Sequence, residues 1–335
     1  MRINSGGTTL NSADLTLAQL SVRWRGVTKS LSKLQKQLKR QGLKADNGTL
    51  LRALSVILTG QSRLNFMFRG ERQNSSLETL ESAWQRVEQG LTSAIHFIVH
   101  NCRIDRLDLL PTEYVLIPLM VFFDKFGDEV TPQQARTLQR WFYMALIWAR
   151  YSTSSETKLD QDVAVLMREG SIDGMIEHIE DQVGKRPVTE RELRDQRVNS
   201  PFMTMAYVLA RHAHAPDWFS GVAIGSGQTL EMHHIFPKKL LRQSYDLRSD
   251  SRIVDQVANL VFVSQRVNRK MAAMAPDAYL HTIAEERLRA QSIPMDTNLW
   301  PLERFEDFML ERRKLLAEAI NRLLQSLSDQ PAMWT

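Results

Sequence analysis

Two adjacent histidines and two asparagines are the residues of this chain best suited to carry chemistry. His233 and His234 lie in Leu-Glu-Met-His-His-Ile-Phe-Pro-Lys, and Asn259 and Asn268 flank Leu-Val-Phe-Val-Ser-Gln-Arg-Val. A neutral imidazole can take up a proton near pH 7, because its pKa lies close to that value. Imidazole nitrogen and amide oxygen can also hold a divalent ion and leave positions open for other ligands. This set suits one-metal hydrolysis of a phosphodiester, in which a water is deprotonated while the ion stabilises charge on the phosphate.

Two short strands and the start of a helix are expected to position these residues. Residues 229–235 and 259–264 have strand patterns, and a helical pattern begins at Gln265. Because neighbouring side chains of a strand point to opposite faces, one histidine can face the ion and the other the attacking water. Asn259 can then brace the loop that carries the histidines, while Asn268 reaches the ion. A further strand is expected at residues 218–224, followed by a turn at Gly225-Ser-Gly227.

The rest of the chain is expected to be helical, so the predicted fold is mainly α with a small α+β element. Apolar residues recur at helical spacing before residue 180, and residues 141–148 are apolar nearly all round, which predicts a buried helix. A helix is expected over residues 114–126, where Pro118 either kinks it or delays its start. Further helices are expected over residues 202–212 and from Pro276 to about Leu327.

A charged segment that begins with Gly184-Lys-Arg-Pro predicts a domain boundary near residue 185. We expect a multi-helical domain at residues 1–185 and a second domain at residues 186–335, with the strand-strand-helix core at about 218–285. A length of 335 residues is sufficient for two hydrophobic cores.

Bulk properties indicate a soluble, cytoplasmic protein. The formal charge of +5 is compatible with a polyanionic partner, although an excess this small is weak evidence. The single cysteine, Cys102, excludes a disulfide within the chain and a cysteine-based zinc site, and it suits a reducing compartment. The first residues contain no apolar signal sequence, and the longest apolar stretch is too short to span a bilayer.

The series His-His-Ile-Phe-Pro, Asn-Leu-Val-Phe and Asn-Arg-Lys resembles the motifs of the HNH, or ββα-metal, nucleases. In particular, it is similar to the nuclease domain of GmrSD-type, modification-dependent type IV restriction endonucleases. The resemblance implies a ββα-metal domain embedded in helices and preceded by a multi-helical half. It implies a metal-dependent DNA endonuclease of a restriction system that defends against phage or modified DNA, with Mg²⁺, Mn²⁺ or another transition metal as cofactor.

The resemblance also assigns roles to individual residues. His234 corresponds to the general base and His233 to a metal ligand. Asn259 corresponds to the central asparagine that orients the loop, and Asn268 to the second metal ligand. Many relatives have Asp where His233 stands, so the expected site is less anionic than theirs.

Basic residues close to the motif are expected to contact the phosphates of DNA: Arg269, Lys270, Lys238 and Lys239. The alternative interpretation is a solvated rim around the site. A second basic segment, residues 33–44, is interpreted as an ordinary solvated helix surface.

A weaker resemblance extends over the first half of the chain. Residues 2–14 are similar to a segment late in the N-terminal domain of these enzymes, and Arg150-Tyr-Ser with Glu156 and Asp162 resembles their middle region. The family's nucleotide-handling part, with its Asp-Gly-Gln-Gln-Arg signature, is not in this sequence, and no nucleotide site is visible in it. A separate chain carrying that part is therefore an expected partner. The alternatives to an enzyme are a non-catalytic DNA-binding or assembly subunit of a split restriction system and a truncated fragment.

Overall fold

The computed structural model describes residues 11–69, 75–152, 155–225, 229–244, 251–271 and 273–328. Within these ranges the chain is mainly helical and contains one antiparallel sheet of two strands. The chain divides into two compact units that alternate along the sequence. The first unit consists of Met1–Phe97, Thr112–Pro132 and Arg150–His178, and the second of Ile98–Pro111, Gln133–Ala149 and Ile179–Thr335. A division into independent domains at residue 185 stays a prediction.

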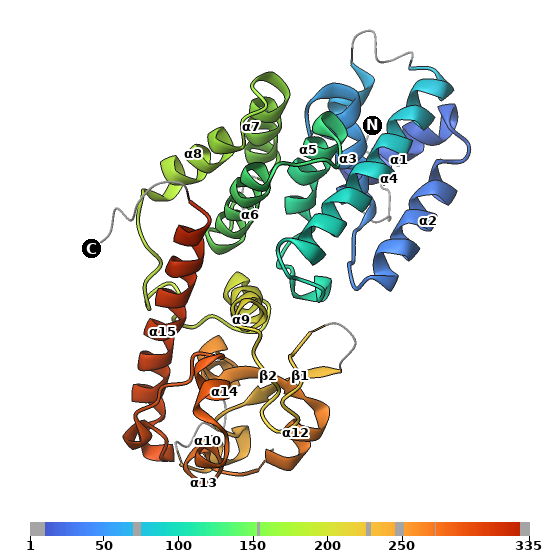
Figure 1. The fold of residues 1–335 in the computed structure, drawn as a ribbon. Coiled ribbons are helices and arrows are strands. Elements are labelled where there is room, and N and C mark those ends of the chain that lie inside the picture. The colour runs from blue at the N-terminus through green and yellow to red at the C-terminus, as the bar shows by residue number, and fades with distance from the viewer. Residues whose placement is uncertain are drawn as a thin grey trace, which may run out of the picture. The chain divides into compact units, whose positions relative to one another are not determined.

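The first unit is helical throughout its described elements (Figure 1). It contains α1 (Ser12–Arg23), α2 (Val27–Arg40), α3 (Asn47–Thr59), most of α4 (Leu77–His100), α5 (Leu116–Phe126), α7 (Ser155–Arg168) and the first half of α8 (Ile172–Val183). Helix α1 packs against α2 and α3, and α5 packs against α3 and α7. Polar side chains satisfy free backbone N–H groups at the start of two helices, Asn11 at α1 and Asp46 at α3.

Helix α5 shows how proline sets the start of a helix. Residues Glu113–Val115 form a 3-10 turn, and α5 begins at Leu116. Pro118 is thus in the first turn, where its missing N–H has no helical acceptor to lose. Of the two outcomes expected for Pro118, the structure has the delayed start.

A buried carboxylate, that of Asp162 in α7, organises part of the first unit. The side chain of Asp162 is fully buried and accepts hydrogen bonds from Arg150 at 2.9 and 3.1 Å, from the Tyr151 hydroxyl at 2.6 Å and from His178 Nδ1 at 2.8 Å. Four donors and one full opposite charge offset the cost of removing this carboxylate from water. The Arg150, Tyr151 and Asp162 positions singled out in the sequence therefore form part of the core.

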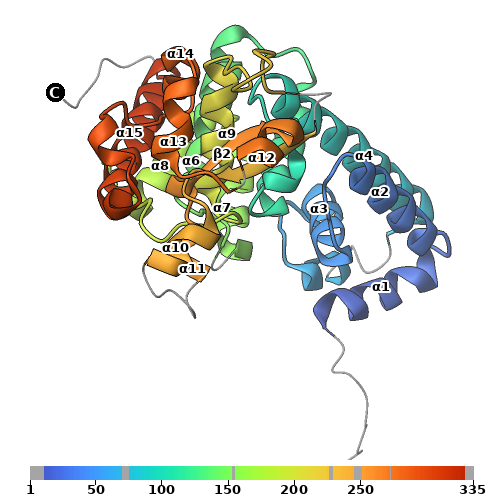
Figure 2. The ribbon, with the colours of Figure 1, turned by 90° about the horizontal axis from the view of Figure 1, so that it is seen from below.

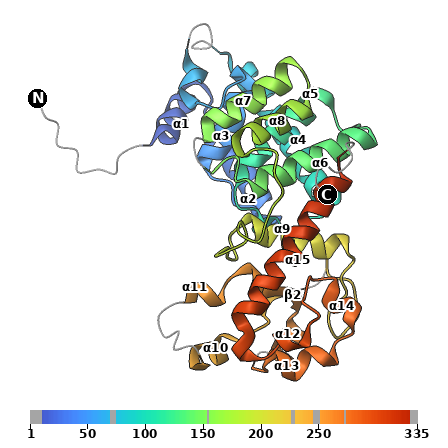
Figure 3. The ribbon, with the colours of Figure 1, turned by 90° about the vertical axis from the view of Figure 1, so that its left-hand side faces the viewer.

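The second unit surrounds the sheet with helices. It contains α6 (Pro132–Ile147) after its first residue, the end of α8, α9 (Pro201–His212), α10 (Lys238–Ser244), α11 (Ser251–Val254), α12 (Gln265–Met271), α13 (Pro276–Tyr279), α14 (Glu285–Arg289) and α15 (Phe305–Ser326). Residues Trp141–Ile147 of α6 are buried, which confirms the predicted buried helix. Helix α15 packs against α9 (Figure 3) and also against the Val257–Asn259 turn. Phe236 packs edge-on against Phe305 and Phe308 of α15.

The sheet pairs β1 (Leu230–His234) with β2 (Leu260–Ser264) in an antiparallel register that runs from Leu230 opposite Ser264 to His234 opposite Leu260. Helix α12 follows β2 directly (Figure 2) and packs on both strands. Both predicted strands around the motif and the helix after them are confirmed.

The prediction of a strand at residues 218–224 is wrong. These residues form a turn, closed by an isolated bridge between Pro216 and Ala223. The Asp217 carboxylate accepts from the backbone N–H and hydroxyl of Ser220, which favours a turn over an extended chain. Trp218 contributes to the apolar pattern of this segment because its side chain is buried in the hydrophobic core. Of the turn predicted to follow, Ser226 and Gly227 lie outside the described residues, as do residues 2–10 of the N-terminal resemblance.

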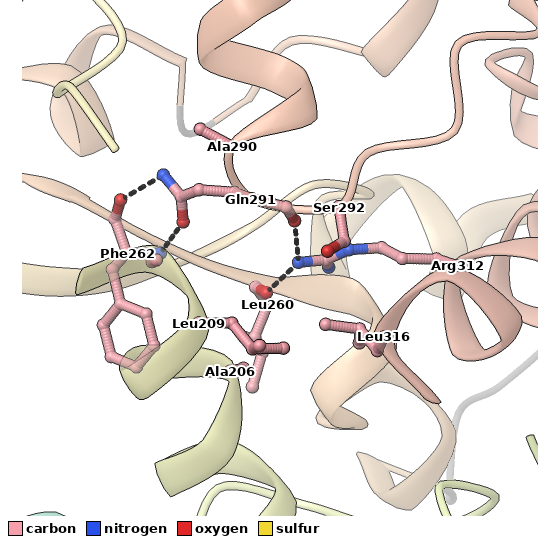
Figure 4. A pocket seen from close by; sticks show the side chains of 10 residues that line it. Ala206, Leu209, Leu260, Phe262, Ala290, Gln291, Ser292, Arg312 and Leu316 are labelled. Atoms are coloured by element: carbon pink, nitrogen blue, oxygen red, sulfur yellow. Dashed lines mark hydrogen bonds between the residues drawn. The ribbon is translucent and has the colours of Figure 1, made fainter. Parts of the chain in front are cut away.

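Side chains cover the edge of β2 that β1 leaves unpaired (Figure 4). The Gln291 amide accepts from the Phe262 N–H at 2.9 Å and donates to the Phe262 carbonyl at 2.8 Å. The Arg312 guanidinium donates to the carbonyls of Ala258, Leu260 and Gln291 at 2.9, 2.8 and 3.2 Å. Burial lowers the pKa of Arg312 to about 9, which still leaves it charged at neutral pH. The buried backbone of β2 thus has partners on both edges.

Among the helices that the structure describes, none combines the length and the hydropathy needed to cross a bilayer.

Candidate active site

The two histidines of β1 have different surroundings, as expected for neighbours on opposite faces of a strand. The His233 ring is 2% exposed and packs edge-on against Trp218 and Tyr279. The His234 side chain is 23% exposed and contacts Asp255. One imidazole is therefore buried, and the other is accessible to water.

His233 meets Asn268 and Glu231 in a three-residue cluster. His233 Nδ1 lies 2.8 Å from Asn268 Oδ1, and Asn268 Nδ2 donates to Glu231 Oε2 at 2.5 Å. Glu231 and His233 are two positions apart in β1 and share a face, while Asn268 comes from α12. Since its nitrogen is bound to Glu231, Asn268 must present its oxygen to His233. Burial lowers the pKa of His233 to about 4, so this imidazole is neutral at pH 7.

The donor atoms of this cluster fit a divalent ion. Two ligands at right angles around an ion, with bonds of about 2.1 Å, lie about 3 Å apart, and His233 Nδ1 and Asn268 Oδ1 are 2.8 Å apart. Amide and carboxylate oxygens suit Mg²⁺ and Mn²⁺, whereas an imidazole nitrogen suits transition metals such as Zn²⁺ and Ni²⁺. No group of three or more His, Cys, Asp or Glu that could hold an ion occurs in the described part of the chain. An ion here would thus depend on the Asn268 amide.

The two ring nitrogens of His233 contact Asn268 and Tyr279. The Tyr279 hydroxyl donates to the Ile235 carbonyl at 2.9 Å, so its oxygen is able to accept from His233 Nε2, which is 3.4 Å away. With the proton on Nδ1, His233 donates to Asn268 Oδ1. With the proton on Nε2, Nδ1 has a free lone pair that could bind an ion together with Asn268 Oδ1.

His234 forms a second cluster, with Asp255 and Lys238. His234 Nε2 and Lys238 Nζ lie 2.8 and 2.7 Å from the same oxygen of Asp255. Burial lowers the pKa of His234, and the Asp255 contact opposes this shift. Burial raises the pKa of Asp255, but the bonds from Lys238 and His234 outweigh it, so the pKa is lower than usual and Asp255 is ionised at neutral pH. An ionised Asp255 accepts a hydrogen bond from His234 Nε2–H and leaves Nδ1 as the basic nitrogen.

Asn259 lies where the predicted bracing role requires it. Its side chain is fully buried, and it accepts from the Phe236 N–H at 2.8 Å and donates to the carbonyls of Phe236 and Val254 at 3.0 Å each. Phe236 is the second residue after His234. Asn259 thus holds the loop after the histidines against the end of α11.

The predicted phosphate-binding residues lie on two helices of the second unit. Lys238 and Lys239 are in α10, and Arg269 and Lys270 are in α12. Lys239, Arg269 and Lys270 are exposed, and Lys270 Nζ lies 4.3 Å from the centre of the Phe219 ring. Lys238, by contrast, is paired with Asp255. Their contacts with DNA stay a prediction.

Three residues of these clusters were not singled out in the sequence: Glu231, Asp255 and Tyr279. Glu231 had a usable signal, because it is two residues before His233 in a predicted strand and must share its face. Asp255 and Tyr279 lie outside the two strands and reach the histidines through tertiary folding, so no local pattern marks them.

No protein-family model matches the chain, and no curated protein matches it at a significant level. A functional interpretation therefore depends on the geometry of the two histidine clusters together with the motif resemblance.

Proposed function

We propose that this protein is a metal-dependent DNA endonuclease with an HNH-type active site on β1, β2 and α12. The observation that carries the proposal is the division of labour between adjacent histidines. His233 is buried and neutral and converges with Asn268, whereas His234 is accessible and held by a carboxylate. From the motif resemblance, we further propose that the substrate is phage or otherwise modified DNA and that the protein belongs to a restriction system.

His234 acts as the general base in this proposal. Asp255 accepts a hydrogen bond from Nε2–H at 2.8 Å and leaves Nδ1 able to take a proton from water. The same carboxylate stabilises the imidazolium that forms, as an acidic residue does for a catalytic histidine elsewhere. Asp255 is thus a positioning residue that acts through His234.

His233 and Asn268 would hold the metal ion, with Glu231 fixing the orientation of Asn268. When bound, the ion supplies stabilisation of the charge that develops on the phosphate and the leaving oxygen. Asn259 keeps the loop after His234 in place and thereby fixes the base relative to these two ligands.

Nicking of supercoiled plasmid by the purified protein tests the proposal. With Mg²⁺ or Mn²⁺ we expect nicking that EDTA abolishes and that His234→Ala lowers by at least about 100-fold, the usual contribution of a general base. The matched control is His281→Ala, since His281 is exposed and lies outside both clusters. Circular dichroism should show equal folding of all three proteins.

Two results would refute an endonuclease: unchanged nicking by His234→Ala, or a well-folded wild type that does not nick. If that wild type still bound DNA, the non-catalytic subunit of a split system would replace the enzyme as the best interpretation.

A further inference from the structure

The segment 15–45 of the first unit has an unusual charge distribution. It contains eight basic residues and no Asp or Glu, although the whole chain has nearly balanced charges. All eight are exposed: Arg23, Arg25, Lys29, Lys33, Lys36, Lys39, Arg40 and Lys44. A solvated helix surface normally mixes both signs, so the absence of acidic residues needs another explanation.

Four of these residues form a row on one face of α2, which we call the cationic stripe: Lys29, Lys33, Lys36 and Arg40. At about 100° per residue they fall within an arc of about 60°. The opposite face of α2 carries Val27, Leu31, Leu34 and Leu38, which are 1–2% exposed. Burial of the apolar face fixes the rotation of the helix, so the stripe is displayed outward over about 16 Å, at about 1.5 Å per residue.

Carboxylates do not neutralise the stripe within the described part of the chain. No stripe residue takes part in an ion pair there. Glu88, Asp124 and Asp128 line a surface pocket together with Lys33, and Asp124 is paired with Arg86. Like charges three or four residues apart destabilise a helix by about 0.2–0.5 kcal/mol per pair. The stripe therefore costs stability that an external polyanion would offset.

We propose that the cationic stripe binds the phosphate backbone of duplex DNA without sequence preference. The choice of DNA as the polyanion rests on the proposed function. The charge and exposure of the stripe are observed independently of that function. Duplex DNA presents one negative charge per about 1.7 Å of its axis, so the length of the stripe spans several phosphates. A membrane-surface helix would need an apolar face beside its cationic one, and the apolar face of α2 is buried.

The test compares two variants of the full chain that lose the same charge. The stripe variant is Lys29→Gln, Lys33→Gln, Lys36→Gln and Arg40→Gln. The control variant is Arg289→Gln, Arg304→Gln, Lys314→Gln and Arg322→Gln; these residues are exposed, but each is paired with a carboxylate. Fluorescence anisotropy with a labelled 30-base-pair duplex in EDTA measures affinity without cleavage.

We expect the stripe variant to bind at least about tenfold more weakly at low salt, and its plot of log K against log [salt] to be shallower by about 3 to 4, at about 0.9 per lost phosphate contact. The control variant should stay within about twofold of wild type. Equal losses in both variants, no loss in the stripe variant, or wild-type binding to phosphatidylserine vesicles but not to DNA would overturn the inference. Melting curves establish that both variants fold.

Failure of the inference and failure of the proposed function give different results. Stripe-dependent DNA binding by a wild type that does not nick refutes the endonuclease and supports the stripe. Metal-dependent nicking with equal DNA affinity in the wild type and the stripe variant supports the endonuclease and refutes the stripe.

Discussion

At the residue scale, the candidate site depends on how one strand separates two identical side chains. The His233 ring packs against the rings of Trp218 and Tyr279, and its burial favours the neutral imidazole. His234 faces Asp255, whose charge favours a proton on Nε2. A metal ligand must be unprotonated and a base must have a free lone pair, and the two faces of β1 meet these two requirements separately.

The positioning role of Asp255 predicts a loss of turnover without a loss of binding. Asp255→Asn keeps the size of the side chain but removes the charge that orients His234, and we expect kcat for nicking to fall by about 10- to 100-fold. DNA affinity in EDTA should change by less than about twofold, and Asp255→Glu should restore part of the activity. The exposed Asp277→Asn is the control. A drop in activity that parallels a drop in melting temperature would instead mean that Asp255 only supports the fold.

Glu192 predicts a pH-dependent contribution to stability. Burial raises its pKa, but hydrogen bonds from Arg186 and Thr189 outweigh this and lower the pKa from 4.5 to about 2. Because the folded pKa is lower than the unfolded one, the contribution is complete above about pH 5 and is lost as the pH falls towards 2. After allowance for screening by solvent, Glu192→Gln should destabilise the protein by about 1 kcal/mol at pH 7.

Urea denaturation at pH 7, 5, 4 and 3 measures this contribution. The difference between wild type and Glu192→Gln should shrink steadily below pH 5, whereas exposed Glu286→Gln should show no such trend. A difference that stays constant with pH would contradict the assigned cause.

At the element scale, β2 is completed by side chains that replace a third strand. Gln291 bonds both the N–H and the carbonyl of Phe262, and Arg312 bonds the carbonyl of Leu260 (Figure 4). Arg312 also bonds the carbonyl of Ala258. A two-stranded sheet alone is marginally stable in water. These bonds therefore help to hold the strand that precedes α12 and Asn268.

Removal of the Gln291 amide tests this role. Gln291→Ala leaves the buried N–H and carbonyl of Phe262 without partners, and we expect it to lower the free energy of unfolding by about 2–3 kcal/mol. Exposed Gln325→Ala in α15 should change it by less than about 0.5 kcal/mol. Chemical denaturation followed by circular dichroism measures both, and equal effects would mean that the edge of β2 does not need Gln291.

Local pattern predicts some of these elements and cannot predict others. Residues 260–263 are a short apolar run followed by a helical pattern, which correctly predicts β2 and α12. Residues 218–224 have a similar run, but the Asp217 side chain closes a turn there. Asp255, Gln291 and Arg312 each contact a residue that is distant in sequence: Asp255 is 21 residues from His234, Gln291 is 29 from Phe262, and Arg312 is 52 from Leu260. Spacing therefore predicts the histidines and asparagines, and only the folded structure identifies what orients them.

At the scale of the whole molecule, the second unit takes segments from both sides of the predicted boundary. Residues Ile98–Pro111 and Gln133–Ala149 belong to it together with Ile179–Thr335. Within this unit, buried Thr204 and Tyr207 of α9 donate to the Leu109 carbonyl and to Asp105. The composition change near residue 185 identifies a polar segment. Composition carries no information on the hydrogen bonds that join α9 to residues 105–109.

These contacts predict that residues 186–335 are unstable when expressed alone. The fragment leaves the hydroxyls of Thr204 and Tyr207 without their acceptors and exposes the surface of α9 that packs on residues 107–109. Each lost buried hydrogen bond costs about 1–3 kcal/mol, and 1 kcal/mol shifts the melting temperature of a unit of this size by about 2–4 °C. We therefore expect the fragment to melt at least about 5 °C below the full chain, by circular dichroism. The control is the full chain cut after folding at a protease site placed at Lys185, which keeps all segments and should melt close to the intact chain. A fragment that melts as sharply and as high as the intact chain would show instead that residues 98–111 and 133–149 are dispensable and that residue 185 is a true domain boundary.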